Sequence, residues 1–137
     1  MPSWARDGNN IVHTRYSTEF ISQEVFIMNP NGRNPNRLTY NSKDDRFPKI
    51  VYDKNIVYWS DSYLWLIDST GSNKRQITTE GVDVDFGHPF SLSPDGNKIV
   101  YTKYEPNNWT YENGTLWIID LITAEKRQLT FNPKPEN

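Results

Sequence analysis

The chain has 137 residues, which is enough for one domain and too few for two well-buried ones. Its 15 basic and 17 acidic residues leave a net charge of -2 and are scattered, so nucleic acid is not expected as a partner. Every apolar run is far shorter than the ~20 residues that cross a bilayer, so no membrane span is expected. The lack of cysteine fits a reducing cytoplasm and a bacterial envelope equally, and the compartment stays open.

Five Trp, eight Tyr and six Phe give the chain large side chains to bury. They occur in short runs with Ile and Val, and Gly, Pro, Asn and Asp clusters separate these runs. No segment keeps the i, i+3, i+4 spacing of a helix. This pattern predicts an all-β protein.

Taken in chain order, the elements form three copies of one unit. The first copy reads PSWARDGNNIVHTR and then VFIMNPNGRNPNRLTYN, the second PKIVYDKNIVYWS and then LWLIDSTGSNKRQIT, and the third PFSLSPDGNKIVYTK and then LWIIDLITAEKRQLTFN. Aligning them matches Pro2, Pro48 and Pro89 at the start, and a Leu-Thr or Ile-Thr pair at the end. A period of about 40 to 50 residues with four short strands per copy is typical of a β-propeller blade.

The third copy defines the expected strands a to d, at residues 90–93, 99–103, 116–120 and 127–130. Its SPDG cluster predicts the a–b turn, because proline presets φ and Gly96 can take a positive φ. The first copy has Ala5 and Arg6 at the Ser-Pro positions. The second copy has lost both the proline and the glycine, so we expect a different turn there.

The run of proline, SPDG, IVYT, LWIID and RQLT resembles the propeller repeat of TolB. It is also similar to the N-terminal propellers of the dipeptidyl peptidase and prolyl oligopeptidase relatives. The resemblance covers nearly the whole chain and implies a propeller fold. Similarity to TolB implies a protein–protein role in the envelope, although no single residue identifies such a partner.

The repeat predicts a single partial propeller over residues 1–137, with blade 1 at about 2–46, blade 2 at about 47–87 and blade 3 at about 88–137. Three four-stranded blades are half of a six-bladed ring and leave an apolar face at each end. The chain is then either an excerpt from a longer propeller or a half that pairs with a second copy. We expect a homodimer of two times three blades.

In a propeller the b–c loops and d–a connections emerge on one face, and ligands usually bind there. That face is predicted to carry residues 15–23, 60–63 and 104–113 from the b–c loops and 40–47, 79–88 and 131–137 from the d–a connections and the tail. The longest loop, YEPNNWTYENG, offers Tyr104, Glu105, Trp109 and Tyr111 as contact residues for a protein or peptide. The alternative is that these rings pack on a neighbouring blade.

Two polar stretches, KDDRF and DVDFGH, precede Pro48 and Pro89. They could supply a polar ligand site or hold a cation, and the candidates are Asp44, Asp45, Arg46, Asp83, Asp85 and His88. The Asp83-x-Asp85 spacing is not an EF-hand loop, so no metal and no cofactor are expected. In the alternative reading these acids cap turns or pair with basic residues.

No catalytic residues are assigned, because G-x-S-x-G, cysteine and H-E-x-x-H are all absent from the sequence. His13 aligns with Tyr58 and Tyr101 and is read as a structural strand residue. The leading hypothesis is a non-catalytic scaffold that self-associates through blade faces and binds a protein, peptide or small polar ligand with its loops. The alternative is the propeller portion of a larger peptidase or lyase, and a third reading is a purely structural half-propeller.

Overall fold

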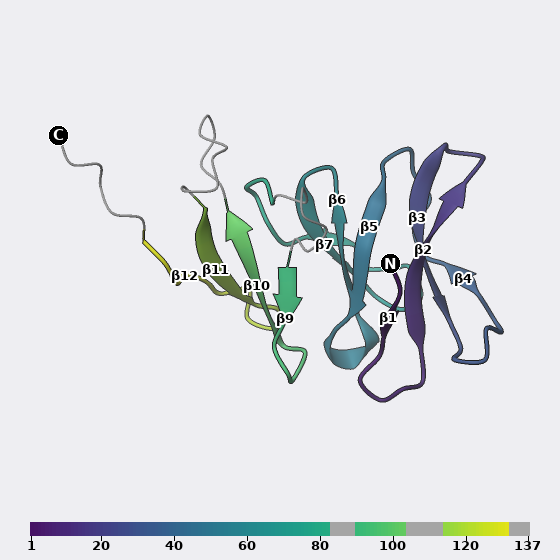
Figure 1. Ribbon diagram of the computed structural model, residues 1–137, viewed down its shortest axis with the longest axis horizontal. Helices are drawn as coiled ribbons and strands as arrows, with labels where there is room; N and C mark the ends of the chain where they lie inside the picture. Colours follow the sequence, from purple (N-terminus) through teal and green to yellow (C-terminus); the bar gives the residue numbers. More distant parts are fainter. Residues whose placement is uncertain (83–89, 104–113, 132–137) are drawn as a thin grey trace. The chain divides into compact units, whose positions relative to one another are not determined.

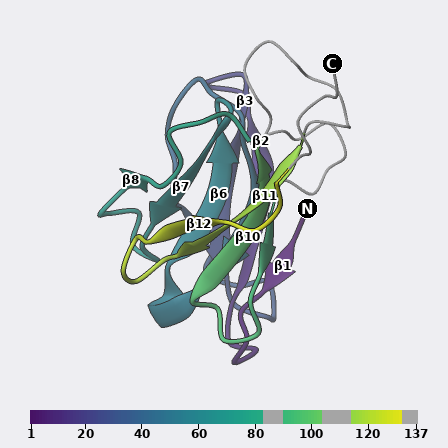
Figure 2. The same cartoon turned by 90° about the vertical axis from the view of Figure 1, so that its left-hand side faces the viewer.

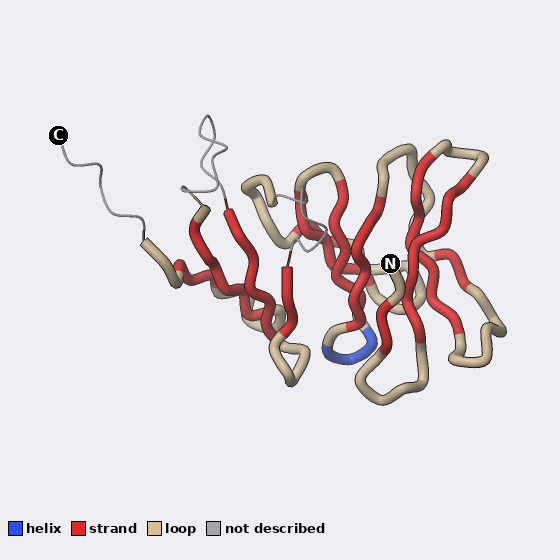
Figure 3. Tube along the Cα trace, viewed as in Figure 1, coloured by secondary structure: helices blue, strands red, loops and turns tan. Residues whose placement is uncertain are grey.

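The computed structural model describes residues 1–82, 90–103 and 114–131. The chain divides into two compact units, Met1–Thr79 and Glu80–Asn137, and each is treated by itself. The strands form three four-stranded antiparallel sheets, and the described ranges contain no α-helix (Figures 1 and 3). The prediction of an all-β chain with three four-stranded units is confirmed.

Each sheet is built from one continuous stretch of chain, with its strands side by side in sequence order. In the first unit, sheet 1 contains β1 (Ser3–Trp4), β2 (Ile11–Ser17), β3 (Ser22–Met28) and β4 (Asn36–Arg37). Sheet 2 contains β5 (Asp45–Ile50), β6 (Ile56–Ser60), β7 (Tyr63–Ile67) and β8 (Arg75–Gln76), and the last three can be followed in Figure 2. In the second unit, sheet 3 contains β9 (Phe90–Leu92), β10 (Lys98–Lys103), β11 (Thr115–Asp120) and β12 (Lys126–Gln128).

The repeated Leu-Thr or Ile-Thr pair closes the fourth strand of every sheet. The N–H groups of Leu38, Ile77 and Leu129 donate to the carbonyls of Val25, Leu64 and Leu116 at 2.8, 2.8 and 2.7 Å. The hydroxyls of Thr39, Thr78 and Thr130 then accept from the N–H groups of those same third-strand residues at 2.9, 2.9 and 2.8 Å. Each threonine therefore continues the ladder with its side chain, which explains why the pair recurs.

The a–b turns of the first and third copies have the same geometry despite their different sequences. The Gly8 N–H donates to Ala5 and the Gly96 N–H to Ser93, both at 3.0 Å, and both glycines have positive φ. The second copy instead forms the 3-10 turn η1 (Tyr52–Lys54), in which Asp53 and Lys54 take φ values of 48° and 57°. The prediction of a different turn in this copy is confirmed.

Two predicted loops are shorter than expected. The first b–c loop was expected over residues 15–23, but the ladder pairs residues 15–17 with residues 22–24, so β2 continues to Ser17 and β3 begins at Ser22. The connection expected over residues 40–47 ends earlier, since β5 begins at Asp45. The register of β5 shifts between Arg46 and Lys49, so Pro48 lies in an irregular part of the ladder where its missing N–H is tolerated.

The core of the first unit lies between sheets 1 and 2. Sheet 1 contributes Ala5, Val12, Val25, Ile27 and Leu38, and sheet 2 contributes Ile50, Ile56, Tyr58 and Ile67, with Trp65 packed against them. These residues alternate along their strands, as expected where one face of a sheet is buried. The contact between these two faces is called the sheet 1–sheet 2 seam.

The threonine of the closing pair is expected to matter most where it is buried. Thr78 is fully buried, so Thr78→Val leaves the Leu64 N–H without its partner and should lower the free energy of unfolding by about 1–3 kcal/mol. Thr130→Val is the matched control in the single chain, where water can reach that exposed position and replace the hydroxyl, so both variants are compared at a concentration at which the chain is monomeric. Urea unfolding of both variants measures the difference, and equal losses would contradict this role for burial.

Candidate functional site

Two of the predicted site residues, Asp44 and Arg46, lie together where the chain enters β5. An Arg46 guanidinium nitrogen donates to Asp44 Oδ2 at 2.6 Å, and both side chains remain partly exposed. Asp44 Oδ1 also accepts the Gln23 N–H at 2.9 Å. This N–H and then Arg46 lower the pKa of Asp44, so the carboxylate stays ionised. Asp44 thus joins β3 of sheet 1 to the start of sheet 2.

The other predicted site residues lie outside the described residues. Asp83, Asp85 and His88 fall in residues 83–89, and Tyr104, Glu105, Trp109 and Tyr111 fall in residues 104–113. Their roles in ligand contact stay predictions.

Sequence reasoning missed a buried polar cluster beside the connection from sheet 1 to sheet 2, and Glu24 is its centre. Its carboxylate is fully buried and accepts hydrogen bonds from Thr39 Oγ1 at 2.6 Å, Ser22 Oγ at 2.9 Å and the Asn41 N–H at 3.1 Å. The Arg37 guanidinium lies 3.6 Å away and stacks over the Tyr40 ring. The alternating pattern of β3 gives no signal for this site, because it does not reveal that the loop after β4 covers the carboxylate.

Asp45 extends this cluster into sheet 2. Its Oδ2 accepts from Asn41 Nδ2 at 2.8 Å, and the same Asn41 donates its N–H to Glu24. Burial raises the pKa of Asp45, and burial together with the Asp45 and Glu24 charges raises the pKa of Tyr58. Glu24, Asp45 and Tyr58 are all buried, and Asn41 links the Glu24 carboxylate of sheet 1 to the Asp45 carboxylate of sheet 2.

One face of sheet 3 is apolar. It is called the outer face and consists of Val100, Leu116, Ile118 and Leu129. The ladder places Val100 opposite Ile118, and the Leu129 N–H donates to Leu116, so these side chains share one side of the sheet. Leu116 and Leu129 are each 41% exposed. The opposite face carries the buried Phe90, Ile99, Tyr101 and Ile119.

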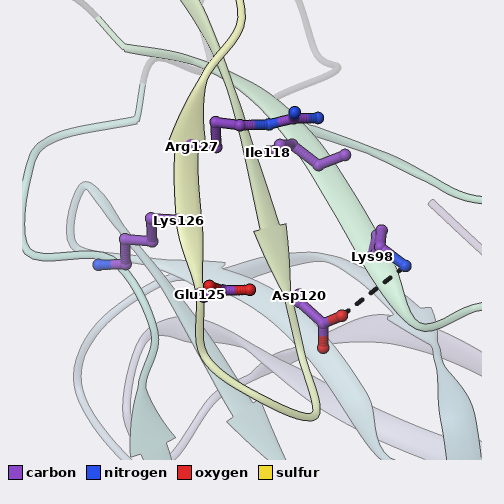
Figure 4. A pocket seen from close by; sticks show the side chains of 6 residues that line it. All are labelled: Lys98, Ile118, Asp120, Glu125, Lys126 and Arg127. Carbon is purple, nitrogen blue, oxygen red and sulfur yellow. Dashed lines mark ion pairs between the residues drawn. The ribbon is translucent and has the colours of Figure 1, made fainter.

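A pocket of about 430 Å³ lies at one end of the outer face (Figure 4). Ile118 is its apolar wall, and charged side chains from β10, β11 and the start of β12 surround it: Lys98, Asp120, Glu125, Lys126 and Arg127. Lys98 Nζ and Asp120 Oδ2 are 3.7 Å apart. Mixed charge around an apolar centre resembles the polar rim of a protein interface.

Within the described ranges, no group of three or more His, Asp or Glu side chains is placed to hold a metal ion. The same part of the chain contains no helix long and apolar enough to cross a membrane.

No protein-family model matches the sequence. The solved structures that resemble it include an oligogalacturonate lyase in complex with manganese, with a TM-score of 0.79 and 17% identity. Two others are dipeptidyl peptidase 4 from Porphyromonas gingivalis, at 0.73 and 12%, and TolB from Acinetobacter baumannii, at 0.70 and 24%. The similarity covers 95%, 94% and 94% of this chain. The chain has a TolB-like β-propeller fold.

The three sheets are therefore propeller blades 1 to 3, and the predicted propeller is confirmed. The chain spans 40%, 18% and 31% of the length of the lyase, the peptidase and TolB, in that order, so it corresponds to a minor part of each. At this level of identity the similarity concerns the fold alone. Activity and partners have to be argued from this chain's own residues.

The raised pKa of Asp45 predicts a pH dependence of stability. The folded chain binds this proton more tightly than the unfolded chain, so the contribution of Asp45 is complete below the ordinary carboxyl pKa of 3.8 and is lost as the pH rises through the raised pKa. In Asp45→Asn this loss should be absent, so its unfolding free energy should improve relative to the wild type above about pH 4. Urea unfolding across pH measures it.

Asp61→Asn is the control, since the Asp61 side chain is 61% exposed and pairs with Lys43 at the surface. A stability difference between Asp45→Asn and the wild type that stays constant with pH would show that the Asp45 carboxyl does not titrate differently on folding.

Proposed function

We propose that this chain is a non-catalytic propeller scaffold that associates with a second copy of itself through the faces of its terminal blades. One observation carries the proposal. The outer-face residues Leu116 and Leu129 of blade 3 are each 41% exposed, whereas their repeat equivalents in blade 1, Val25 and Leu38, are 0% and 3% exposed. Blade 2 covers that face of blade 1 through the sheet 1–sheet 2 seam.

An exposed face of this kind favours association, because burying apolar side chains removes area from water at about 25 cal/mol per Å². The outer-face residues occupy positions that a neighbouring blade covers elsewhere in the repeat, so a blade of a second copy is a suitable partner for them.

The proposal also includes ligand binding. A protein, peptide or small polar ligand would bind at the Asp44–Arg46 pair and at the face that carries the b–c loops and d–a connections.

The alternative is that the chain is the propeller portion of a larger peptidase or lyase and positions substrate for a catalytic domain. The similarity to propellers of an oligogalacturonate lyase and a dipeptidyl peptidase, of which this chain spans a minor part, favours it. In that case a further blade of the same polypeptide covers the outer face. A catalytic domain in the same reading frame would decide for this alternative.

Light scattering after size exclusion tests the proposal on the chain itself. The wild type is expected at twice its 16.1 kDa, and the double variant Leu116→Glu with Leu129→Glu is expected at the monomer mass, because two carboxylates at the centre of the face resist desolvation. Circular dichroism shows whether the double variant keeps the β-sheet signal of the wild type.

Ile122→Glu is the matched control, because Ile122 is 61% exposed in the turn after β11 and does not belong to the outer face. It should keep the mass of the wild type. A wild type that remains a stable monomer at every concentration would overturn the proposal.

A further inference from the structure

The seam inside the first unit shows how one blade seats on the next. The turn between β7 and β8 brings Gly71 so close to blade 1 that an added Cβ would lie 3.2 Å from the Leu38 carbonyl oxygen and 3.6 Å from Leu38 Cα. Gly71 also has a φ of +85°. Glycine is therefore required at this position for two reasons: the positive φ of the turn and the close approach of the two backbones.

Blade 1 repeats this turn without a neighbour. The Gly32 N–H donates to Asn29 at 2.9 Å, as the Gly71 N–H donates to Asp68 at 3.0 Å, and Gly32 has a φ of +80°. Nothing lies within 4 Å of an added Cβ at Gly32. The Gly32 turn therefore has the same hydrogen bond and positive φ as the Gly71 turn that contacts blade 1, but the space beside an added Cβ at Gly32 is open.

Blade 3 offers the matching half of such a contact. Leu129 corresponds to Leu38, since each donates its N–H to the third strand of its own blade and each precedes the closing threonine. Around it, Val100, Leu116 and Ile118 take the positions of Val12, Val25 and Ile27, which line the seam in blade 1.

The uncovered face of blade 1 matches the face that blade 2 presents to the seam. Trp4, opposite Ile11 in the ladder, takes the place of Ile50, which is opposite Ile56, and it is 60% exposed where Ile50 is 5% exposed. Next to it, Ile11, His13, Phe26 and Met28 take the places of Ile56, Tyr58, Trp65 and Ile67. One chain thus carries both halves of a second seam, one on each terminal blade.

We infer that the Gly32 turn of a second copy packs on the Leu129 backbone of blade 3, as Gly71 packs on Leu38 within the chain. The inference rests on the proposed self-association and adds the register of the contact. The uncovered face of blade 1 in the second copy, which includes Trp4 and Phe26, then covers the outer face of blade 3. Because every copy has both halves, two copies related by a twofold axis form the contact twice and leave neither half unused.

Gly32→Val tests this register, with Gly8→Val as its matched control. Both glycines have positive φ, +80° and +73°, and both have open space around an added Cβ, so the strain within one chain is similar. Only at Gly32 does the side chain meet a second backbone in the dimer. The dissociation constant from sedimentation equilibrium should rise by about tenfold or more for Gly32→Val and stay unchanged for Gly8→Val.

The outcomes separate the two proposals. A monomeric wild type overturns self-association and the inference with it, whereas a dimeric wild type with equal dissociation constants for both variants overturns the inference alone. If the valines prevent folding, cysteine pairs replace them, because the chain has no cysteine of its own. Under oxidation, Gly32→Cys with Leu129→Cys should give linked dimers on a non-reducing gel and Gly8→Cys with Leu129→Cys should not, while the reverse result overturns the register.

Discussion

The apolar contact between successive blades is the constraint on which the rest of this structure depends. A four-stranded sheet with two apolar faces is not stable alone, so each face needs a partner. In the first unit the seam provides one, with Val12, Val25, Ile56 and Tyr58 removed from water completely. Each such side chain contributes about 1.5–3 kcal/mol by burial, so a handful of them is comparable to the net stability of a small domain.

The segment that joins blades 1 and 2 also fixes how the two sheets meet. Thr39, Asn41 and Asp44 lie on this short connection, and each forms a hydrogen bond with a group in the first half of β3. Apolar packing is not directional, whereas these hydrogen bonds are. The connection therefore sets the orientation of blade 2 on blade 1, and the buried Glu24 provides the common acceptor.

Most of the fold could be predicted from the sequence, because each copy of the repeat contains residues that mark its turns and strand ends. The proline–aspartate–glycine turn of the third copy and the closing threonines mark strand ends, and the loss of glycine in the second copy correctly indicated another turn. The predicted strand ends were wrong in two places. The β2–β3 hairpin keeps pairing through residues 15–17 and 22–24, and Asp45 begins β5 although Pro48 follows it closely.

The polar cluster could not be predicted for a related reason. Glu24, Asp45 and Tyr58 come from three different strands, and Asn41 on the connection between blades 1 and 2 bonds both carboxylates, which no local pattern encodes. Asp44 and Arg46 were predicted as two of several candidates for a polar ligand site. Their side chains do form an ion pair, but Asp44 also accepts a hydrogen bond from the N–H of Gln23 in blade 1. Only the contact between blades reveals that Asp44 has a structural partner.

Each sheet takes its four strands from one continuous segment, so among residues 1–82, 90–103 and 114–131 no blade takes a strand from another blade. Contacts between blades consequently involve side chains and turns, and the main-chain ladders are complete before any two blades meet. Separating blades then exposes apolar surface without breaking a ladder, which is a process marked by a heat-capacity change more than by enthalpy. Duplication or loss of one segment would likewise add or remove a whole blade, so the unit on which evolution can act here is the blade.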